Sequence, residues 1–269
     1  MKITEQPSHF SSLDTMSTRE LLEGINREDH LVADAVHEAL GSIETLVEAT
    51  LERMRRGGRV FYIGAGTSGR LGILDASEIP PTYGAPPDLF IGLIAGGDGA
   101  IRKAVEGAED EPDGAWRDLQ LYHPSELDTL IGIAASGSTP YVVGGIRAAR
   151  KAGLLTGCIT CNPDSELAKA ARIPVVAVPG PEFVTGSTRM KAGTAQKMIL
   201  NMISTTLMIR LGHVKGNRMV DMQLTNSKLV DRGTRMIMDA SPISDYDQAR
   251  ALLLKYGSVR EALDAIENK

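Results

Sequence analysis

Short apolar runs separated by amphipathic stretches mark the middle of the chain. Five runs predict buried strands, at 60–63, 89–95, 130–134, 156–160 and 174–178. Helix-like patterns lie between or after them, at 100–108, 141–152, 165–171 and 189–211. Strands that alternate with helices indicate right-handed crossovers and a parallel sheet covered on both faces. The pattern therefore predicts an α/β fold around a five-stranded parallel sheet.

Helical patterns without strands flank this middle part. Ser17–Glu20 is a capping box that opens a short helix, and from His30 apolar residues recur every three or four positions until Gly57 and Gly58 end the pattern. Short helices are also predicted near the C-terminus. We expect three parts: an N-terminal helical segment at 1–48, a sheet domain at 49–213 and a C-terminal helical cap at 214–269.

A glycine-rich loop follows the first predicted strand. Gly64, Gly66 and Gly69 allow positive φ and close approach of a ligand, and the free N–H groups of the next helix can bind an anion. Thr67 and Ser68 add hydroxyls, which favours a ligand that carries phosphate. The spacing also fits the dinucleotide fingerprint G-x-G-x-x-G, but the acidic residue needed about 20 residues later is not where the next strand would place it. A nicotinamide-dependent dehydrogenase is the weaker alternative.

Two more hydroxyl-rich loops follow later strands, at 135–140 and 180–191. Ser and Thr often only cap helices. Ligands bind at the carboxyl ends of parallel strands, however, and many hydroxyl donors suit a phosphate monoester. Three such loops on one edge predict a sugar-phosphate site. The expected binding residues are Gly66, Thr67, Ser68, Ser136, Gly137, Ser138, Thr139, Ser187, Thr188 and Lys191.

Composition excludes several other classes of protein. The net charge of −5, with interspersed signs, and the scarcity of aromatic residues argue against nucleic-acid binding. The apolar runs are too short to span a bilayer, and the N-terminus does not resemble a signal peptide, so we expect a cytoplasmic protein. Cys158 and Cys161 form a C-x-x-C pair, but a strand context and the absence of a second pair favour a structural role. No metal or cofactor is expected.

Two acidic features are candidates for acid–base chemistry. Glu78 directly precedes Ile79-Pro80-Pro81, which predicts that it ends the helix after the first loop. A carboxylate there faces the negative end of the helix dipole, an unfavourable placement typical of functional sites. The second feature is the acidic run at 106–111, which contains Glu109. Such glutamates are also common as exposed surface residues, and composition alone does not choose among them.

The motifs together resemble one enzyme family. They are GAGTSGRLGILDASE with PPTYG, LIAGG, AVEGAED, IAASGSTPYV, CNP, GPEFVTGSTRMKAGTAQK and NRMVD. They are similar to those of the N-acetylmuramic acid 6-phosphate etherases, which are built on the sugar isomerase (SIS) domain. The resemblance implies an SIS-type three-layer sandwich and a homodimer whose active sites share residues across the interface, with the long helix at 189–211 as the interface candidate.

The family also implies a reaction and two catalytic residues. The D-lactyl ether of the substrate is cleaved by elimination and water addition, without a cofactor, as a step of N-acetylmuramate catabolism and peptidoglycan recycling. Glu78 resembles the proton donor, and Glu109 matches the second catalytic glutamate. Two alternatives stay open: a non-catalytic regulatory module that senses sugar phosphates, and an aldose–ketose isomerase, which also removes a C2 proton.

Overall fold

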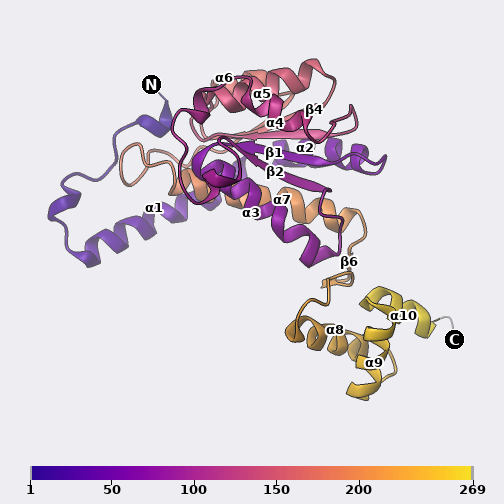
Figure 1. Cartoon of the computed structure of the whole chain (residues 1–269). Helices are drawn as coiled ribbons and strands as arrows, with labels where there is room; N and C mark the ends of the chain where they lie inside the picture. Colours follow the sequence, from indigo (N-terminus) through magenta and orange to yellow (C-terminus); the bar gives the residue numbers. More distant parts are fainter. Residues whose placement is uncertain (1, 268–269) are drawn as a thin grey trace. The chain divides into compact units, whose positions relative to one another are not determined.

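The computed structural model describes residues 2–267 and divides into two compact units (Figure 1). The first unit runs to Ala76 and resumes over Phe90–Ser204; the second comprises Ser77–Leu89 and the chain from Thr205 onward. Helices α3 (Gly66–Tyr83) and α7 (Lys191–Arg210) each begin in the first unit and end in the second. No helix within residues 2–267 is long and apolar enough to cross a membrane.

A five-stranded parallel sheet, counted over the described residues, is the centre of the first unit. Its order is β2-β1-β3-β4-β5. The strands are β1 (Val60–Gly64), β2 (Phe90–Ile94), β3 (Thr129–Ile133), β4 (Leu155–Thr160) and β5 (Ile173–Val176). Each is a short apolar run, and β1, β3 and β4 are buried along their whole length, as expected for a sheet covered on both faces. The predicted α/β class and all five strands are confirmed.

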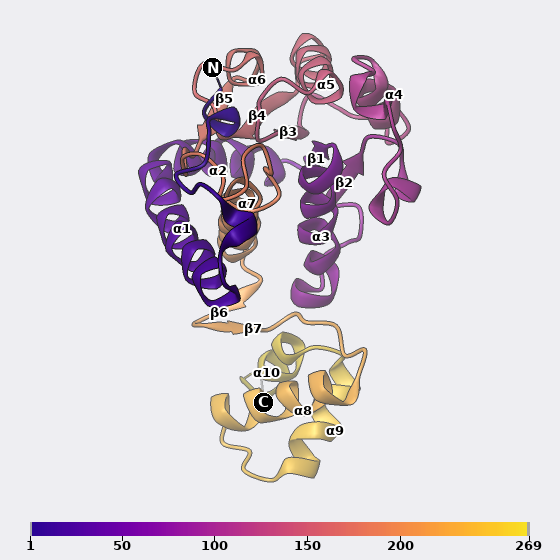
Figure 2. The same ribbon diagram turned by 90° about the vertical axis from the view of Figure 1, so that its left-hand side faces the viewer.

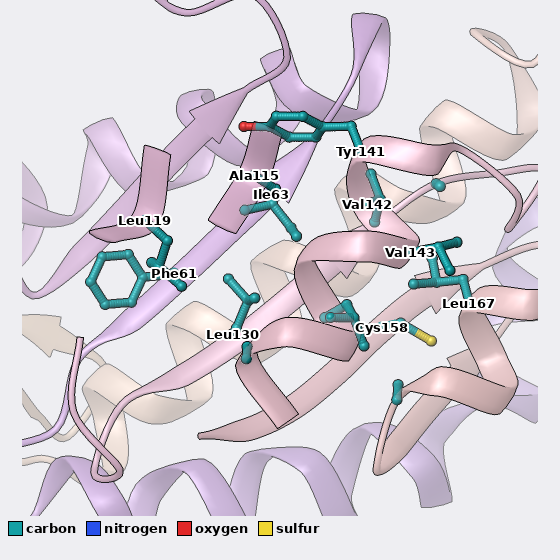
Figure 3. Close-up of a cluster of buried hydrophobic side chains, with 14 of the residues drawn as sticks. Phe61, Ile63, Ala115, Leu119, Leu130, Tyr141, Val142, Val143, Cys158 and Leu167 are labelled. Atoms are coloured by element: carbon teal, nitrogen blue, oxygen red, sulfur yellow. The ribbon is translucent and has the colours of Figure 1, made fainter. Parts of the chain in front are cut away.

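Helices cover both faces of this sheet. On one side lie α4 (Gly114–Gln120), α5 (Pro140–Lys151) and α6 (Glu166–Ala170); on the other lie α2 (Leu40–Met54) and the first parts of α3 and α7 (Figures 1 and 2). The side chains of Phe61, Leu130 and Tyr141 belong to the core between the sheet and α4–α6 (Figure 3). Short 3-10 turns occur at Ile3–Glu5, Leu13–Thr15, Asp98–Ile101 and Ala108–Asp110.

The N-terminal helices differ in extent from the prediction. The capping box is present, because Ser17 accepts from the Glu20 N–H and the Glu20 carboxylate accepts from the Ser17 N–H. The helix that it opens, α1 (Thr18–Glu38), is long rather than short and runs through His30 without a break. It meets α2 at Ala39, so the repeating apolar pattern spans two helices.

The predicted helix at 100–108 is wrong. Gly96, Gly97 and Gly107 all have positive φ, and between them only the 3-10 turn at Asp98–Ile101 forms. Glycine disfavours helix, and the few residues left between these positions do not repay the cost of helix nucleation. The segment that contains Glu109 is therefore a loop with one 3-10 turn, not the end of a helix.

Besides the ends of α3 and α7, the described part of the second unit contains a small hairpin and three helices. The strands are β6 (Val214–Lys215) and β7 (Arg218–Met219); the helices are α8 (Ser227–Ala240), α9 (Tyr246–Tyr256) and α10 (Val259–Glu267). Ile237, Ala249 and Leu253 are fully buried in their common core. The predicted short helices are capped, since the N–H of Gln248 donates to Asp245 and that of Glu261 donates to Ser258. This unit therefore has its own hydrophobic core.

Candidate active site

The β1–α3 connection is a tight, glycine-dependent turn. An added Cβ at Gly64 would lie 2.6 Å from the backbone nitrogen of Gly69, so the loop closes only with glycine there. Gly66 has a φ of 53° and starts α3, which places Thr67 and Ser68 in its first turn. The free N–H groups and the positive dipole end of that turn favour an anion.

The loop after β3 is equally constrained. Gly137 has a φ of 64°, and a Cβ there would lie 2.3 Å from the Cβ of Ser165. The hydroxyls of Ser136 and Ser138 lie 3.2 Å apart, and the Ser138 N–H donates to Ser136 Oγ. Pro140 begins α5, so this loop also ends at a helix N-terminus. Two helix starts and a set of hydroxyls thus meet at one edge of the sheet.

These loops line one cavity of about 420 Å³ in the first unit. Its volume lies within the range of small-molecule sites. The lining residues are Glu5, Ala65, Gly66, Thr67, Ser68, Glu109, Asp110, Ile133, Ala134, Ala135, Ser136, Ser138, Thr139, Pro140 and Thr188. The structure therefore brings together most of the hydroxyls predicted from the sequence, and Glu109 with them. Gly137 instead lines an adjoining cavity, which shares Ser136 and Ser138.

Glu109 reaches the cavity from the 3-10 turn Ala108–Asp110. Gly107 precedes this turn with a φ of 75°, a conformation that suits glycine. Asp110, another member of the predicted acidic run, and the distant Glu5 also line the cavity, and no sequence pattern pointed to Glu5. Nothing in the local sequence distinguishes Glu5, because only the path of the N-terminal segment brings it to this edge.

The third hydroxyl-rich loop contributes less than predicted. Thr188 lines the cavity, whereas Ser187 is not among the lining residues. Lys191 is 1% exposed and forms a buried ion pair with Glu28 of α1. Burial raises the pKa of Glu28, but Lys191 and His9 outweigh it, so the net shift is downward. Because its ammonium group pairs with Glu28, which is distant in the sequence, Lys191 is not among the residues that line the cavity.

Glu182 completes this arrangement. Its carboxylate accepts hydrogen bonds from the backbone N–H groups of Lys191 and Ala192, at 2.8 and 3.0 Å. These are the first N–H groups of α7, so Glu182 caps that helix. In the adjacent turns of α7, Gln196 accepts from the hydroxyl of Ser68 at 2.9 Å. Gln196 is a buried contact of the first loop that the sequence patterns did not indicate.

Glu78 is not at a helix end. Helix α3 continues to Tyr83 with Pro80 and Pro81 inside its last turns, so the predicted boundary is wrong. Each proline removes a helical hydrogen bond and crowds the preceding turn, but the helix continues past both, and the Gly84 N–H closes it by donating to the Pro80 carbonyl at 2.9 Å. Glu78 is exposed and belongs to the second unit. It lies twelve residues beyond Gly66 in one helix, about 18 Å of helical rise.

The cysteines have the properties of buried core residues. Burial raises the pKa of both Cys158 and Cys161 to about 12, so neither is a ready thiolate at neutral pH. Within residues 2–267 no group of three or more His, Cys, Asp or Glu side chains could hold a metal ion.

The fold and the hydroxyl-lined cavity define an SIS-type protein of the sugar-phosphate class. A family model described as the glucokinase regulatory protein N-terminal SIS domain matches residues 42–150. A solved structure of a phosphosugar isomerase involved in capsule formation from Bacteroides fragilis, described as putative in its name, has a TM-score of 0.55 at 24% identity; it covers 72% of this chain and 92% of that one.

Full-length relatives define the family more narrowly. The N-acetylmuramic acid 6-phosphate etherase of Bacteroides thetaiotaomicron is 61% identical over 98% of this chain and 95% of its own. The protein of the same name from Porphyromonas gingivalis is 61% identical over 100% of this chain and 97% of its own. The chain belongs to the N-acetylmuramic acid 6-phosphate etherases.

Proposed function

We propose that this chain cleaves the D-lactyl ether of N-acetylmuramic acid 6-phosphate, a carbon–oxygen lyase reaction followed by hydration. The products are N-acetylglucosamine 6-phosphate and D-lactate. The observation that carries the proposal is the single cavity of about 420 Å³ that gathers the hydroxyls of three loops, two helix N-termini and Glu109. Hydroxyls and free N–H groups suit the phosphate, and a carboxyl group suits proton transfer.

The chemistry explains why carboxyl groups suffice. In the open-chain aldehyde the C2 proton is acidic, and the C3 ether oxygen lies β to it. One group removes the C2 proton while another protonates the departing lactyl oxygen; water then adds across the C2–C3 double bond. Overall, one substrate molecule and one water molecule give one molecule of N-acetylglucosamine 6-phosphate and one of D-lactate. Glu109 lines the cavity and is assigned one of these proton transfers, and Glu78 the other.

Phosphate binding is assigned to the loops at the sheet edge. Thr67 and Ser68 with Gly66 form one side, and Ser136 to Thr139 form the other. Thr188 joins them from the third loop. Ser187 and Lys191 stay as predicted binding residues, for which the cavity of this chain gives no support.

The position of Glu78 supports the predicted homodimer. Glu78 lies about 18 Å along α3 from the loop that lines the cavity, whereas two groups acting on neighbouring carbons must both reach the same substrate. We assign the second carboxyl group of each site to Glu78 of a partner subunit. The long helix α7 is our candidate for the interface. We also propose that the reaction takes place in the cytoplasm, as the sequence predicts.

The decisive experiment is release of D-lactate from N-acetylmuramic acid 6-phosphate in ¹⁸O-water. We expect lactate release with label in the amino-sugar product, because water adds at C3 after the ether bond breaks. Label found only in lactate would exclude the elimination path. Glu109→Gln keeps the shape but cannot exchange a proton, so turnover should fall by about 10²-fold or more.

The regulatory alternative receives support from the family model of a glucokinase regulatory protein domain. A sensor of that kind would bind sugar phosphates in the same cavity and release no lactate. An aldose–ketose isomerase would interconvert an aldose and a ketose phosphate. Incubation with N-acetylglucosamine 6-phosphate and analysis for a ketose product separates that reaction from ether cleavage.

A further inference from the structure

The charged side chains that line the cavity of about 420 Å³ are all acidic. Three carboxyl groups line it, those of Glu5, Glu109 and Asp110, and none of the described residues that line it carries a basic side chain. A phosphate monoester brings close to two negative charges into this space at neutral pH. Hydroxyls and backbone N–H groups can bond to its oxygens, but they carry no net charge. A cation beside the hydroxyl loops would offset the repulsion.

The N-terminal segment lies at this edge of the sheet and is hydrogen-bonded to it (Figure 2). Asn162, which follows β4, accepts a hydrogen bond from the Ile3 N–H at 2.7 Å and donates to the Thr4 hydroxyl at 3.1 Å. The same amide donates to the backbone oxygen of Ala135 at 3.0 Å. Asn162 is 5% exposed and Thr4 is 1% exposed. One buried side chain thus joins the N-terminal segment to the start of the Ser136–Thr139 loop.

This anchoring places Lys2 at the loop itself. The Lys2 ammonium donates to the hydroxyl of Ser138, whose oxygen lies 3.2 Å from that of Ser136. Lys2 lines the adjoining cavity of about 470 Å³, and Ser136 and Ser138 belong to the walls of both cavities. The cation therefore lies one hydroxyl away from the proposed phosphate site. Lys2 is exposed, and its long flexible side chain can turn from Ser138 towards a bound anion.

We propose that Lys2 supplies the positive charge that binds the substrate phosphate, delivered by an N-terminal segment that Asn162 holds in place. This inference rests on the proposed sugar-phosphate function. The phosphate is chosen over the lactyl carboxylate because Lys2 contacts the hydroxyl loop to which phosphate binding is assigned. Lys2 is thus a specificity residue for phosphorylated sugars, and the local sequence around the glycine loops gives no sign of it.

The test compares binding of N-acetylglucosamine 6-phosphate and of N-acetylglucosamine by calorimetry, on the full chain with any affinity tag at the C-terminus. Lys2→Gln keeps a hydrogen-bond donor but removes the charge, and should weaken binding of the phosphorylated sugar about tenfold or more. Lys2→Arg should stay within about threefold of wild type, because it keeps the charge. Lys151→Gln, at the exposed far end of α5, removes the same charge and should bind like wild type. The unphosphorylated sugar should not distinguish the variants.

Several results would overturn the assignment. Equal affinities of Lys2→Gln and Lys151→Gln for the phosphorylated sugar reject the proposal. A loss in Lys2→Arg as large as that in Lys2→Gln rejects it as well. A rise in KM for the lactyl substrate without weaker binding of N-acetylglucosamine 6-phosphate would assign Lys2 to the carboxylate instead. Failure of the proposed function is distinct: wild-type protein would release no D-lactate, while the effect of Lys2 on binding of the sugar phosphate could still be present.

Discussion

Asp75 of α3 is a buried carboxyl group, 8% exposed, in a polar network of the first unit. The hydroxyls of Tyr62 and Ser204 donate to its two oxygens at 3.1 and 3.0 Å. Burial raises the pKa of Asp75, and these hydrogen bonds and the charge of Lys197 oppose the rise without cancelling it. The folded protein therefore binds the Asp75 proton more tightly than the unfolded chain does.

The pH dependence of stability follows from this shift. A raised pKa in the folded state contributes stability that is full below the unfolded value, about 4 for aspartate, and is lost as pH rises through the folded value. We expect the unfolding free energy of wild type, relative to Asp75→Asn, to decline over that window. Urea unfolding at a series of pH values measures the difference. Asp88→Asn, an exposed carboxyl outside the network, is the control, and a flat difference for Asp75→Asn would contradict the prediction.

At the scale of elements, the strands were predictable and some of the loops were not. The five strands are contiguous apolar runs, so local pattern and tertiary burial agree. Lys191 looked like a phosphate ligand because it follows hydroxyls at a helix start; its ion pair with Glu28 depends on a residue 163 positions away in the chain. Asn162 and Lys2 are likewise brought to the site by long-range contacts. Patterns in the local sequence do not predict contacts between residues this far apart in the chain.

The Ser136–Thr139 loop provides a prediction at this scale. Ser136→Ala and Thr139→Ala should each weaken binding of the sugar phosphate by about 1.5–3 kcal/mol, because each removes one hydrogen bond to a charged group. Binding of N-acetylglucosamine 6-phosphate by calorimetry measures the loss. Thr45→Ala removes a hydroxyl that bonds only within α2 and serves as the control. Unchanged affinity in both loop variants would remove this loop from the site.

At the scale of the whole molecule, the position of Glu78 is our reason for proposing an active site that two chains share. Within one chain, Gly66 and Glu78 are separated by about 18 Å along α3, and Glu109 lines the cavity at the Gly66 end. A C2 dimer is the commonest arrangement of identical subunits, and it supplies two equivalent copies of each residue. A site formed by Glu109 of one subunit and Glu78 of the other satisfies the chemistry without bending the helix.

Mixed dimers test this arrangement directly. Glu78→Gln and Glu109→Gln homodimers should each be nearly inactive. Co-expression and random pairing make half of the dimers mixed; in a mixed dimer one site has both wild-type glutamates and the other has neither. Activity should therefore recover to about a quarter of wild type, the share expected from two-fold symmetry. If both glutamates of a site came from one chain, every site in the mixed dimer would lack one of them, and no activity would return. A compact monomer in sedimentation at micromolar concentration would also contradict the shared site.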